Sequence, residues 1–549
     1  MEDQTWDIFS DEHLYQLWQK KAEIYCQGAG EFEDRTFGRF NKDVLVYLNR
    51  IGIGKNLIDS LSIIHVTGTK GKGSTCSYVE NILETCGYKT GLLSSPTLLE
   101  IRERIRIGGT VLSQRTFAEY GLTILKRLEE TENTDDEGTT FKQPNLIQYL
   151  TVLCIHIFLQ EKVDVGIVEV FVGGETDCTN IFSSPSCVGI TTLDLDHLGK
   201  LGDSLESIAW HKSGLARKGR PLFTVCQQPG PLKVMAERAA EFGAILKICP
   251  PLSEHDFGGS PIEVGPEGGH QLINASIAIQ LARHWIEERD PHRFTFDATK
   301  QEIYPASKTS IDVNGDIIVD KIPFARPFIL PDQFKKALKE CSLYGRCQIV
   351  RKNQITFYCD VAHTVKSMAS CAKWFLSKAG TQREGIDGRV TRVLMFSMRP
   401  KQQTPEILTQ LLGIDFDAVL FTPSWMTYGE HDEAHPIRFK NPTYRRTPQE
   451  ELINTHQTRM SFEYVRAMKD PTNQKKPIIK EFPSISTALQ WLAGGTHDIP
   501  QKLMTLAPKS DDNFDGGNHI EVLVTGCVTL VGGVIKIYDP SSVLGRDDL

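Results

Sequence analysis

The feature that most constrains this chain is a glycine-rich loop between an apolar strand and a helix. Residues 61–74 read LSIIHVTGTKGKGS, in which a β-branched run precedes glycines, a lysine and a hydroxyl residue. Apolar residues at helical spacing follow until Gly87, and a second strand is expected at 90–94. Glycines let backbone N–H groups approach an anion, and the positive end of a helix dipole attracts it. The stretch therefore predicts a phosphate-binding loop in a mononucleotide-binding βαβ unit.

Within this loop, Lys72 is expected to reach the outer phosphates and Ser74 to ligate Mg²⁺. The spacing departs from the common G-x-x-x-x-G-K-[ST] pattern, because Thr67 stands where the first glycine should be and Gly73 precedes the serine. The sequence instead matches a narrower G-T-x-G-K-G-S variant. We expect its residues to hold the nucleotide, namely Gly68, Thr69, Gly71, Lys72, Gly73 and Ser74.

Strands and helices alternate through both halves of this 549-residue chain, which is too long for one ordinary core. We therefore predict an α/β protein with an N-terminal phosphate-loop ATP-binding domain (1–327) and a C-terminal Rossmann-like α/β domain (328–549). Residues 283–326 suggest an insertion or linker, and residues 425–482 a long surface excursion or lid. Gly532 and Gly533 are expected to form a turn.

Composition narrows the classes of partner. A net charge of −8 without a polybasic block favours neither nucleic acid nor an anionic membrane as the main partner. The apolar run 146–159 is too short to cross a bilayer and predicts a buried helix, so no transmembrane segment is expected. The acidic start of the chain resembles neither a signal nor a transit peptide, which favours the cytosol. The 13 cysteines, with no C-x-x-C pair, are expected to be reduced.

Charged residues follow two of the predicted strands. Glu169 ends an apolar strand, where it faces the phosphate loop if the two strands are neighbours, and with Ser74 it would make a Mg²⁺ site. The alternative is an exposed acid at a strand end. Asp194, Asp196 and His197 follow the next strand and suggest a second cation site, although a single histidine there is more often structural.

Lys212, in the sequence AWHKSGL, does not fit a cation site as an ordinary lysine. An ammonium ion would repel a metal ion. The residue is therefore either a surface charge or chemically altered.

Taken together, a series of motifs resembles the folylpolyglutamate synthases, which belong to the Mur-ligase superfamily of ATP-dependent amide ligases. The resemblance covers nearly the whole chain in the family's order. It rests on HVTGTKGKGSTC, SSPTLLEIRERIRI, LQEKVDVGIVEV with GGETDCTN, DHLGKLGDSLESIAWHKSGL, HQLINAS, LYGRCQIV, CDVAHT, and VLVTG with LVGG. It implies an N-terminal domain of Mur-ligase type.

The resemblance also implies residue roles. Lys72 corresponds to the phosphate-loop lysine, Ser74 and Glu169 to ligands of a first magnesium ion, and His197 to a ligand of a second. Lys212 corresponds to a carbamylated lysine, whose anionic oxygen suits Mg²⁺. Residues that hold the nucleotide from the linker region and C-terminal domain would be Asn274, Arg346, Asp360 and His363. Catalytic roles fall to Lys72, Lys212 and His363.

The implied reaction uses ATP to convert a carboxylate into an acyl phosphate, which an amino group then attacks. The implied partners are a carboxylate acceptor, in the first instance a folate, and an amino acid, in the first instance glutamate. Domain closure would keep water from the intermediate. We expect a monomer.

The chain departs from the family's usual pattern beside the site. Phe171, Asp194 and Val361 stand where glycine is expected, and Thr97 where eukaryotic members usually carry histidine. Bulk at these positions is expected to reshape the pocket or to strain the backbone. Three interpretations follow: a folylpolyglutamate synthase that adds glutamate to a reduced folate, a repurposed ligase acting on another carboxylate, or a non-catalytic nucleotide-binding protein.

Overall fold

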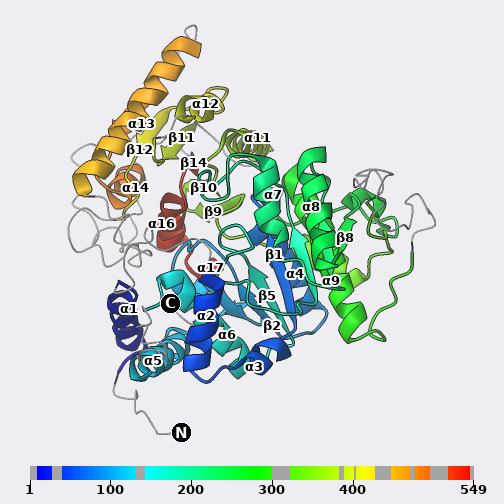
Figure 1. Cartoon of the computed structure of the whole chain (residues 1–549). Coiled ribbons are helices and arrows are strands. Elements are labelled where there is room, and N and C mark those ends of the chain that lie inside the picture. The colour runs from blue at the N-terminus through cyan, green and yellow to red at the C-terminus, as the bar shows by residue number, and fades with distance from the viewer. Residues whose placement is uncertain are drawn as a thin grey trace.

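The structure, a computed structural model, describes residues 9–27, 40–131, 143–298, 322–381, 389–400, 403–426, 447–469, 476–494, 517 and 519–544. These residues form two α/β units, each built on its own sheet (Figure 1). The predicted α/β architecture is therefore confirmed.

The sheet of the first unit has the order β4-β3-β2-β5-β1-β6-β7-β8 among the described residues. The strands from β2 to β8 in this order run parallel, whereas β3 and β4 continue the sheet antiparallel. Their bounds are β1 Ile63–Thr67, β2 Thr90–Leu93, β3 Ile105–Ile107, β4 Thr110–Val111, β5 Val165–Glu169, β6 Cys187–Ile190, β7 Pro221–Thr224 and β8 Ile245–Ile248. β1 lies between β5 and β6, so the carboxyl ends of these three strands share one edge.

Helices cover both faces of this sheet, as a parallel sheet requires. On one face, α1, α2, α5 and α6 share a core with the sheet, and on the other face α4 and α9 do (Figure 1). α10 joins the core of α4 and α9. α7 and α8 pack over β6, β7 and β8. The bounds are α1 Asp11–Gln27, α2 Phe40–Arg50, α3 Lys55–Ser60, α4 Lys72–Thr85, η2 Ile101–Arg104, α5 Gln114–Glu130, α6 Leu146–Glu161, α7 Leu205–Ser213, α8 Pro229–Phe242, η3 Leu252–Glu254, α9 Gly269–Arg289 and α10 Asp332–Glu340.

The end of the first unit lies later in the chain than predicted. Phe328 and Phe334 are fully buried in the core that also contains α4 and α9. The last residue of that core is Leu343. On this packing we place the boundary after Leu343 rather than near Phe328. Most of the insertion predicted at 283–326 lies outside the described residues, although its start belongs to α9.

The second unit has a sheet of the order β13-β12-β11-β14-β10-β9, parallel except for β9. Two clusters of apolar residues pack on its two faces. The strands are β9 Gln348–Lys352, β10 Ile355–Asp360, β11 Val390–Phe396, β12 Ala418–Phe421, β13 Ile478–Glu481 and β14 His519–Thr525. The helices are α11 Val365–Thr381, α12 Thr404–Thr409, α13 Pro448–Lys469, α14 Ile485–Gly494, α16 Val528–Tyr538 and α17 Ser541–Leu544.

Two expectations for the second unit are wrong. Gly532 and Gly533 lie inside α16 and are buried there, so they do not form a turn. The segment 425–482 is not simply a surface excursion, because α13 packs beside α12 and β13 adds an edge strand to the sheet. Figure 1 shows α13 as the long helix that projects from this unit. Residues 427–446 and 470–475 of that segment lie outside the described residues.

Two further expectations concern the cysteines and the apolar helix. All 13 cysteines lie within the described residues and are free thiols, as predicted. The apolar run at 146–159 forms α6, whose middle is buried in the core. None of the described helices combines the length and apolar character needed to span a membrane.

Candidate nucleotide and metal site

The glycine-rich loop has the predicted geometry, because β1 leads through it directly into α4. Gly68 and Gly71 have φ values of 148° and 89°, which side-chain-bearing residues rarely adopt. A Cβ on Gly68 would lie 1.8 Å from Thr191 Oγ1, and one on Gly71 would lie 2.0 Å from Asn274 Oδ1. Gly71 is the N-cap of α4 and supplies no side-chain cap. The first N–H groups of the helix are therefore available to an anion.

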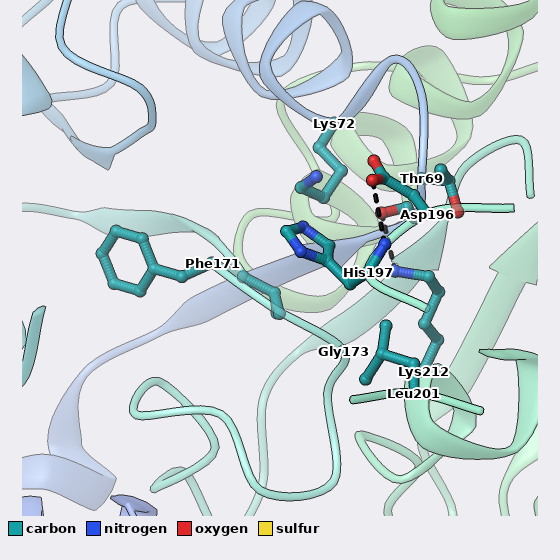
Figure 2. A pocket seen from close by; sticks show the side chains of 10 residues that line it. Thr69, Lys72, Phe171, Gly173, Asp196, His197, Leu201 and Lys212 are labelled. Carbon is teal, nitrogen blue, oxygen red and sulfur yellow. Dashed lines mark hydrogen bonds between the residues drawn. The ribbon is translucent and has the colours of Figure 1, made fainter. Parts of the chain in front are cut away.

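A pocket lies beside this loop at the carboxyl ends of β1, β5 and β6. Its lining residues are Gly68, Thr69, Lys72, Val170, Phe171, Gly173, Asp196, His197, Leu201 and Lys212. Figure 2 shows Lys72, Asp196, His197 and Lys212 gathered on one side, with the ring of Phe171 directed away from them. The structure thus brings the predicted loop, strand-end and α7 residues together.

Glu169 faces the loop lysine, as the sequence predicted. β1 pairs with β5, and Val66 is the register partner of Glu169. Lys72 Nζ lies 3.9 Å from Glu169 Oε1, while Oε2 accepts a hydrogen bond from the Ser95 N–H over 2.8 Å. Only 3% of Glu169 is exposed. Burial raises the pKa of Glu169, and the positive charge of Lys72 opposes that shift. The carboxylate therefore lies where a cation bound beside the phosphates would stabilise its charged form.

Lys212 is buried beside the phosphate loop. It lies at the end of α7, and its Nζ donates a hydrogen bond to the carbonyl oxygen of Gly68 over 2.8 Å. Burial, followed by repulsion from Lys72, lowers the pKa of Lys212 to about 7. A large fraction of the side chain is then a neutral amine at neutral pH. Only the neutral amine can react with CO₂ to form a carbamate, so this environment suits the modification that the resemblance implies.

Asp196 and His197 occupy the turn after β6. The His197 backbone has a φ of 52°, and its N–H donates to Asp196 Oδ1 over 2.9 Å. Burial lowers the pKa of His197, with further lowering from Lys72 and Lys212. Burial alone would raise the pKa of Asp196, but His197 and Lys70 outweigh it and the pKa is lowered. A neutral imidazole beside a carboxylate offers two donors to a divalent cation.

Residues of the second unit approach the same edge. Arg346 donates from Nη1 to the carbonyl oxygen of Val361 over 2.6 Å. Its positive charge partly opposes the raised pKa of Glu169 and adds to the lowering of the Lys70 pKa. His363 is exposed, and its charge contributes to the lowered pKa of Asp196. Both side chains therefore lie near the loop of the first unit.

Asp360 and Asn274 border the site from opposite units. Asp360 Oδ2 accepts a hydrogen bond from the Cys347 N–H over 3.0 Å, and burial raises the pKa of Asp360 although Arg346 opposes that shift. Asn274, on α9, is buried against Gly71 and donates from Nδ2 to Gln271 Oε1 over 3.0 Å. The structure therefore places Asn274 against the loop, whereas Asp360 lies beside Arg346 and Cys347 in the second unit.

Ser74 lies in the first turn of α4, next to the glycine that approaches Glu169. A Cβ on Gly73 would lie 3.5 Å from Glu169 Oε2. Among the described residues, no three His, Cys, Asp or Glu side chains are grouped closely enough to hold a metal ion alone.

Several residues at the site were missed by sequence reasoning. Lys70 is partly buried beside Asp194 and Asp196; burial lowers its pKa while both carboxylates raise it. Asp177 is buried and accepts hydrogen bonds from the N–H groups of Val172, over 2.8 Å, and Thr179, over 3.0 Å, which fixes the loop after β5. The sequence signal for Lys70 was a second lysine between the loop glycines, and the signal for Asp177 was an acid shortly after Gly173 and Gly174.

The residues that replace family glycines do not have a left-handed backbone. Positive φ values outside glycine occur at Lys162, His197, Cys347 and Asn353 among the described residues. Phe171, Asp194 and Val361 are not among them, so none of the three carries the positive φ that glycine would accommodate, and the other alternative, a reshaped pocket, stays a prediction.

Their side chains have partners of their own. Phe171 packs on the core of the first unit, with Arg104 Cζ 5.8 Å from its ring centroid. The Asp194 carbonyl oxygen accepts a hydrogen bond from Thr69 Oγ1 over 3.0 Å. Val361 is buried in the core of the second unit. Thr97 accepts a hydrogen bond from Arg104 Nε over 2.8 Å.

Comparison with known proteins found close relatives in sequence but no matching protein-family model. The mitochondrial folylpolyglutamate synthase of Bos taurus is 35% identical over 522 residues, which cover 90% of this chain and 86% of the relative. That of Homo sapiens is 34% identical over 527 residues, with the same coverage. The folylpolyglutamate synthase of Neurospora crassa is 30% identical over 515 residues, which cover 92% of this chain and 86% of the relative.

Solved structures share the fold. The folylpolyglutamate synthase of Mycobacterium tuberculosis complexed with ADP superposes with a TM-score of 0.64 at 17% identity, over 98% of this chain and 100% of that one. The FolC protein of E. coli in complex with DHPP and ADP superposes with a TM-score of 0.62 at 20% identity, over 96% and 98%. The two-unit fold of this chain is therefore shared with these solved structures.

Proposed function

Because this chain belongs to the folylpolyglutamate synthase family, we propose that it uses ATP to join L-glutamate to the γ-carboxylate of a reduced folate. The observation that carries the proposal is the convergence of Lys72, Glu169 and Lys212 on one phosphate-binding loop. The relatives support a folate acceptor over another carboxylate. Retention of all three residues gives no support to a non-catalytic role.

The reaction proceeds in two transfers. A γ-carboxylate oxygen attacks the γ-phosphorus of ATP, the bond to the bridging oxygen breaks, and ADP leaves an acyl phosphate behind. The amine of glutamate then attacks the acyl carbon, loses a proton, and expels inorganic phosphate to leave an amide. Lys72 holds positive charge beside the transferring phosphate. One such charge at about 4 Å is worth about 4 kcal/mol at an effective dielectric near 20, or roughly 10³ in rate.

The donor set fits two divalent cations. Ser74 and Glu169 would hold one magnesium ion, and His197 with the carbamate of Lys212 would hold the other. When bound, these ions neutralise phosphate charge and polarise the phosphoryl oxygens. The chain's own contribution is to fix these donors at the ends of β5 and β6 and at α7, around one loop. Carbamylation of Lys212 replaces a cation with an anionic oxygen, which removes the repulsion from Lys72.

Residues of both units would hold ATP and close the site. The loop from Gly68 to Ser74 would bind the phosphates, with Asn274 against Gly71. Arg346, Asp360 and His363 would complete the nucleotide site from the second unit. Arg346 can grip a phosphate in a planar bidentate manner. Seating the second unit over the loop would exclude water from the acyl phosphate.

Two further assignments stay predictions. We expect the chain to act as a monomer, because the residues proposed for the site all come from one chain. The cytosolic location stays a prediction of the sequence analysis, whereas the mammalian relatives are named mitochondrial. Fractionation of cells that produce the untagged protein would decide between these compartments.

The proposal is tested by ADP release against a panel of acceptors. The purified protein should form ADP when ATP, Mg²⁺, tetrahydrofolate and glutamate are all present, and the folate should gain one glutamyl residue by mass. Omission of either substrate should suppress ADP formation. Turnover with an unrelated carboxylate but none with tetrahydrofolate would overturn the choice of acceptor.

A further inference from the structure

One short loop of the first unit touches both the candidate metal carboxylate and the second unit. Residues 95–100 lead from β2 toward η2. At the start of the loop, the Ser95 N–H donates to Glu169 Oε2 over 2.8 Å. Further along, Leu98 and Leu99 are buried in a core cluster whose other members belong to the second unit. The loop therefore reaches from the site to the interface between the two units.

A buried carboxylate holds this loop in one shape. Glu103, in η2, accepts hydrogen bonds from the backbone N–H groups of Leu98, of Leu99 over 2.9 Å and of Glu100 over 3.1 Å. Hydrogen bonds to an ionised acceptor are stronger than neutral ones. The three bonds hold residues 98–100 as one piece. Only Pro96 and Thr97 separate this piece from Ser95, and Thr97 is itself held by Arg104 Nε over 2.8 Å, which leaves a short link through which a displacement of Leu98 can reach Ser95.

The second unit rests on the backbone of Leu98 through a glycine. A Cβ on Gly532, in α16, would lie 2.0 Å from the Leu98 carbonyl oxygen. A Cβ on Gly345 would lie 3.0 Å from Leu98 Cδ1. Gly533 faces elsewhere, since the nearest atoms to its Cβ position belong to Ile485, at 3.2 Å. Only the absence of a side chain at Gly532 lets α16 approach the loop this closely.

We propose that Leu98 is a positioning residue, through which the seating of α16 sets the Ser95 amide and hence the carboxylate of Glu169. The metal site is then complete only when the second unit is seated. Phosphate transfer therefore waits until the acyl phosphate that it forms will be protected from water. This inference rests on the proposed function, in which Glu169 holds a magnesium ion. It assigns a role to Leu98, Glu103 and Gly532, none of which lines the pocket.

The test compares two alanine variants of neighbouring glycines, with Mn²⁺ as the probe. Gly532→Ala and Gly533→Ala add the same methyl group to the same buried helix, and both favour helix formation. Mn²⁺ binding to the full-length protein in the presence of ADP is measured by electron paramagnetic resonance.

Gly532→Ala should raise the Mn²⁺ Kd about tenfold or more, the order expected for loss of a hydrogen bond to a charged group. Gly533→Ala should change it less than about twofold, within what ordinary context effects produce. An unchanged Kd in a folded Gly532→Ala protein overturns the proposal.

A second variant keeps the test decisive if Gly532→Ala does not fold. Glu103→Gln keeps the side-chain volume and leaves α16 untouched, but it removes the charge that binds the loop's N–H groups. It should weaken Mn²⁺ binding to a similar extent, and an unchanged Kd overturns the proposal. Glu169→Ala separates the role of Glu169 as a metal ligand from the role of Leu98 in positioning it. If Glu169→Ala loses Mn²⁺ binding while Gly532→Ala and Glu103→Gln bind Mn²⁺ normally, only the role of Leu98 is overturned. If Glu169→Ala itself binds Mn²⁺ normally, the assignment of Glu169 as a metal ligand is overturned.

Discussion

Lys212 Nζ donates a hydrogen bond to the carbonyl oxygen of Gly68 over 2.8 Å, so a lysine on α7 contacts the phosphate loop directly. The same lysine is almost fully buried, and burial with repulsion from Lys72 lowers its pKa to about 7. An unmodified cation is poorly accommodated at this position. This relationship supports a carbamate on Lys212 that turns the position into an anionic ligand.

Lys212→Ala should be inactive and should recover part of its activity with added formate or acetate, because a short carboxylate can occupy the vacated ligand position. Steady-state ADP release with and without the added acid measures this. Incubation of the wild type with ¹³CO₂ should give a carbamate carbon resonance that Lys212→Ala lacks. Wild-type activity in Lys212→Ala would show that the lysine has no role in catalysis.

Lys72→Ala should lower kcat/KM for ADP formation by about 10³, because it removes a full charge from beside the phosphates. The matched control is Lys126→Ala, which breaks only an exposed pair with Glu130 at 3.8 Å on α5 and should leave the rate unchanged. Both proteins should keep wild-type circular dichroism spectra. Retention of more than about a tenth of kcat/KM, a loss under about 1.4 kcal/mol, would contradict the assigned role.

Gly71→Ala should raise the Kd for ADP about tenfold or more, because the new methyl group would press on Asn274 in the loop that binds phosphate. Gly219→Ala is the control. The φ of Gly219 is 72°, close to the 89° of Gly71, but a Cβ on Gly219 would meet no atom within 4 Å. Both variants should lose about 1 kcal/mol of stability from backbone strain, and only Gly71→Ala should lose nucleotide affinity in a calorimetric titration. Equal ADP affinities in the two variants would contradict the account.

The fold and much of the site could be predicted from the sequence, because both depend on local patterns. The loop glycines and Lys72 follow one apolar strand and Glu169 ends another, and neighbouring parallel strands bring their carboxyl ends to one edge. The role of Lys212 required the resemblance, since no local pattern explains a buried lysine.

Other features depend on contacts between distant segments. Gly532 and Gly533 were expected to form a turn, yet they are needed inside α16, where Gly532 contacts the backbone of Leu98. The Ser95 amide that binds Glu169 is a backbone group, which no side-chain motif reveals. α13 was missed because its sequence is polar and follows a proline-rich stretch, so packing on the second unit decides its structure.

Folding stability should fall as pH decreases from about 6.5 toward about 3 because of His65 under the phosphate loop. His65 is buried and hydrogen-bonded to Thr179 Oγ1 at 2.9 Å, and burial lowers its pKa from 6.5 to about 3. Across that window the unfolded chain binds a proton that the folded chain does not. The free energy of unfolding therefore falls by about 1.4 kcal/mol for each unit by which the pH decreases. In urea titrations, His65→Gln should lose less stability than the wild type between pH 6.5 and pH 5. Parallel pH dependences would show that His65 does not titrate on unfolding.

If the acceptor carboxylate is activated as an acyl phosphate, one of its oxygens must leave with the inorganic phosphate, and an isotope experiment detects that transfer. Tetrahydrofolate labelled with ¹⁸O in its γ-carboxylate is incubated with ATP, Mg²⁺ and glutamate, and the inorganic phosphate is analysed by mass spectrometry. Each phosphate released should carry one ¹⁸O atom, because the oxygen that attacks the γ-phosphorus leaves with it. Formation of the glutamylated product with unlabelled phosphate would contradict the account.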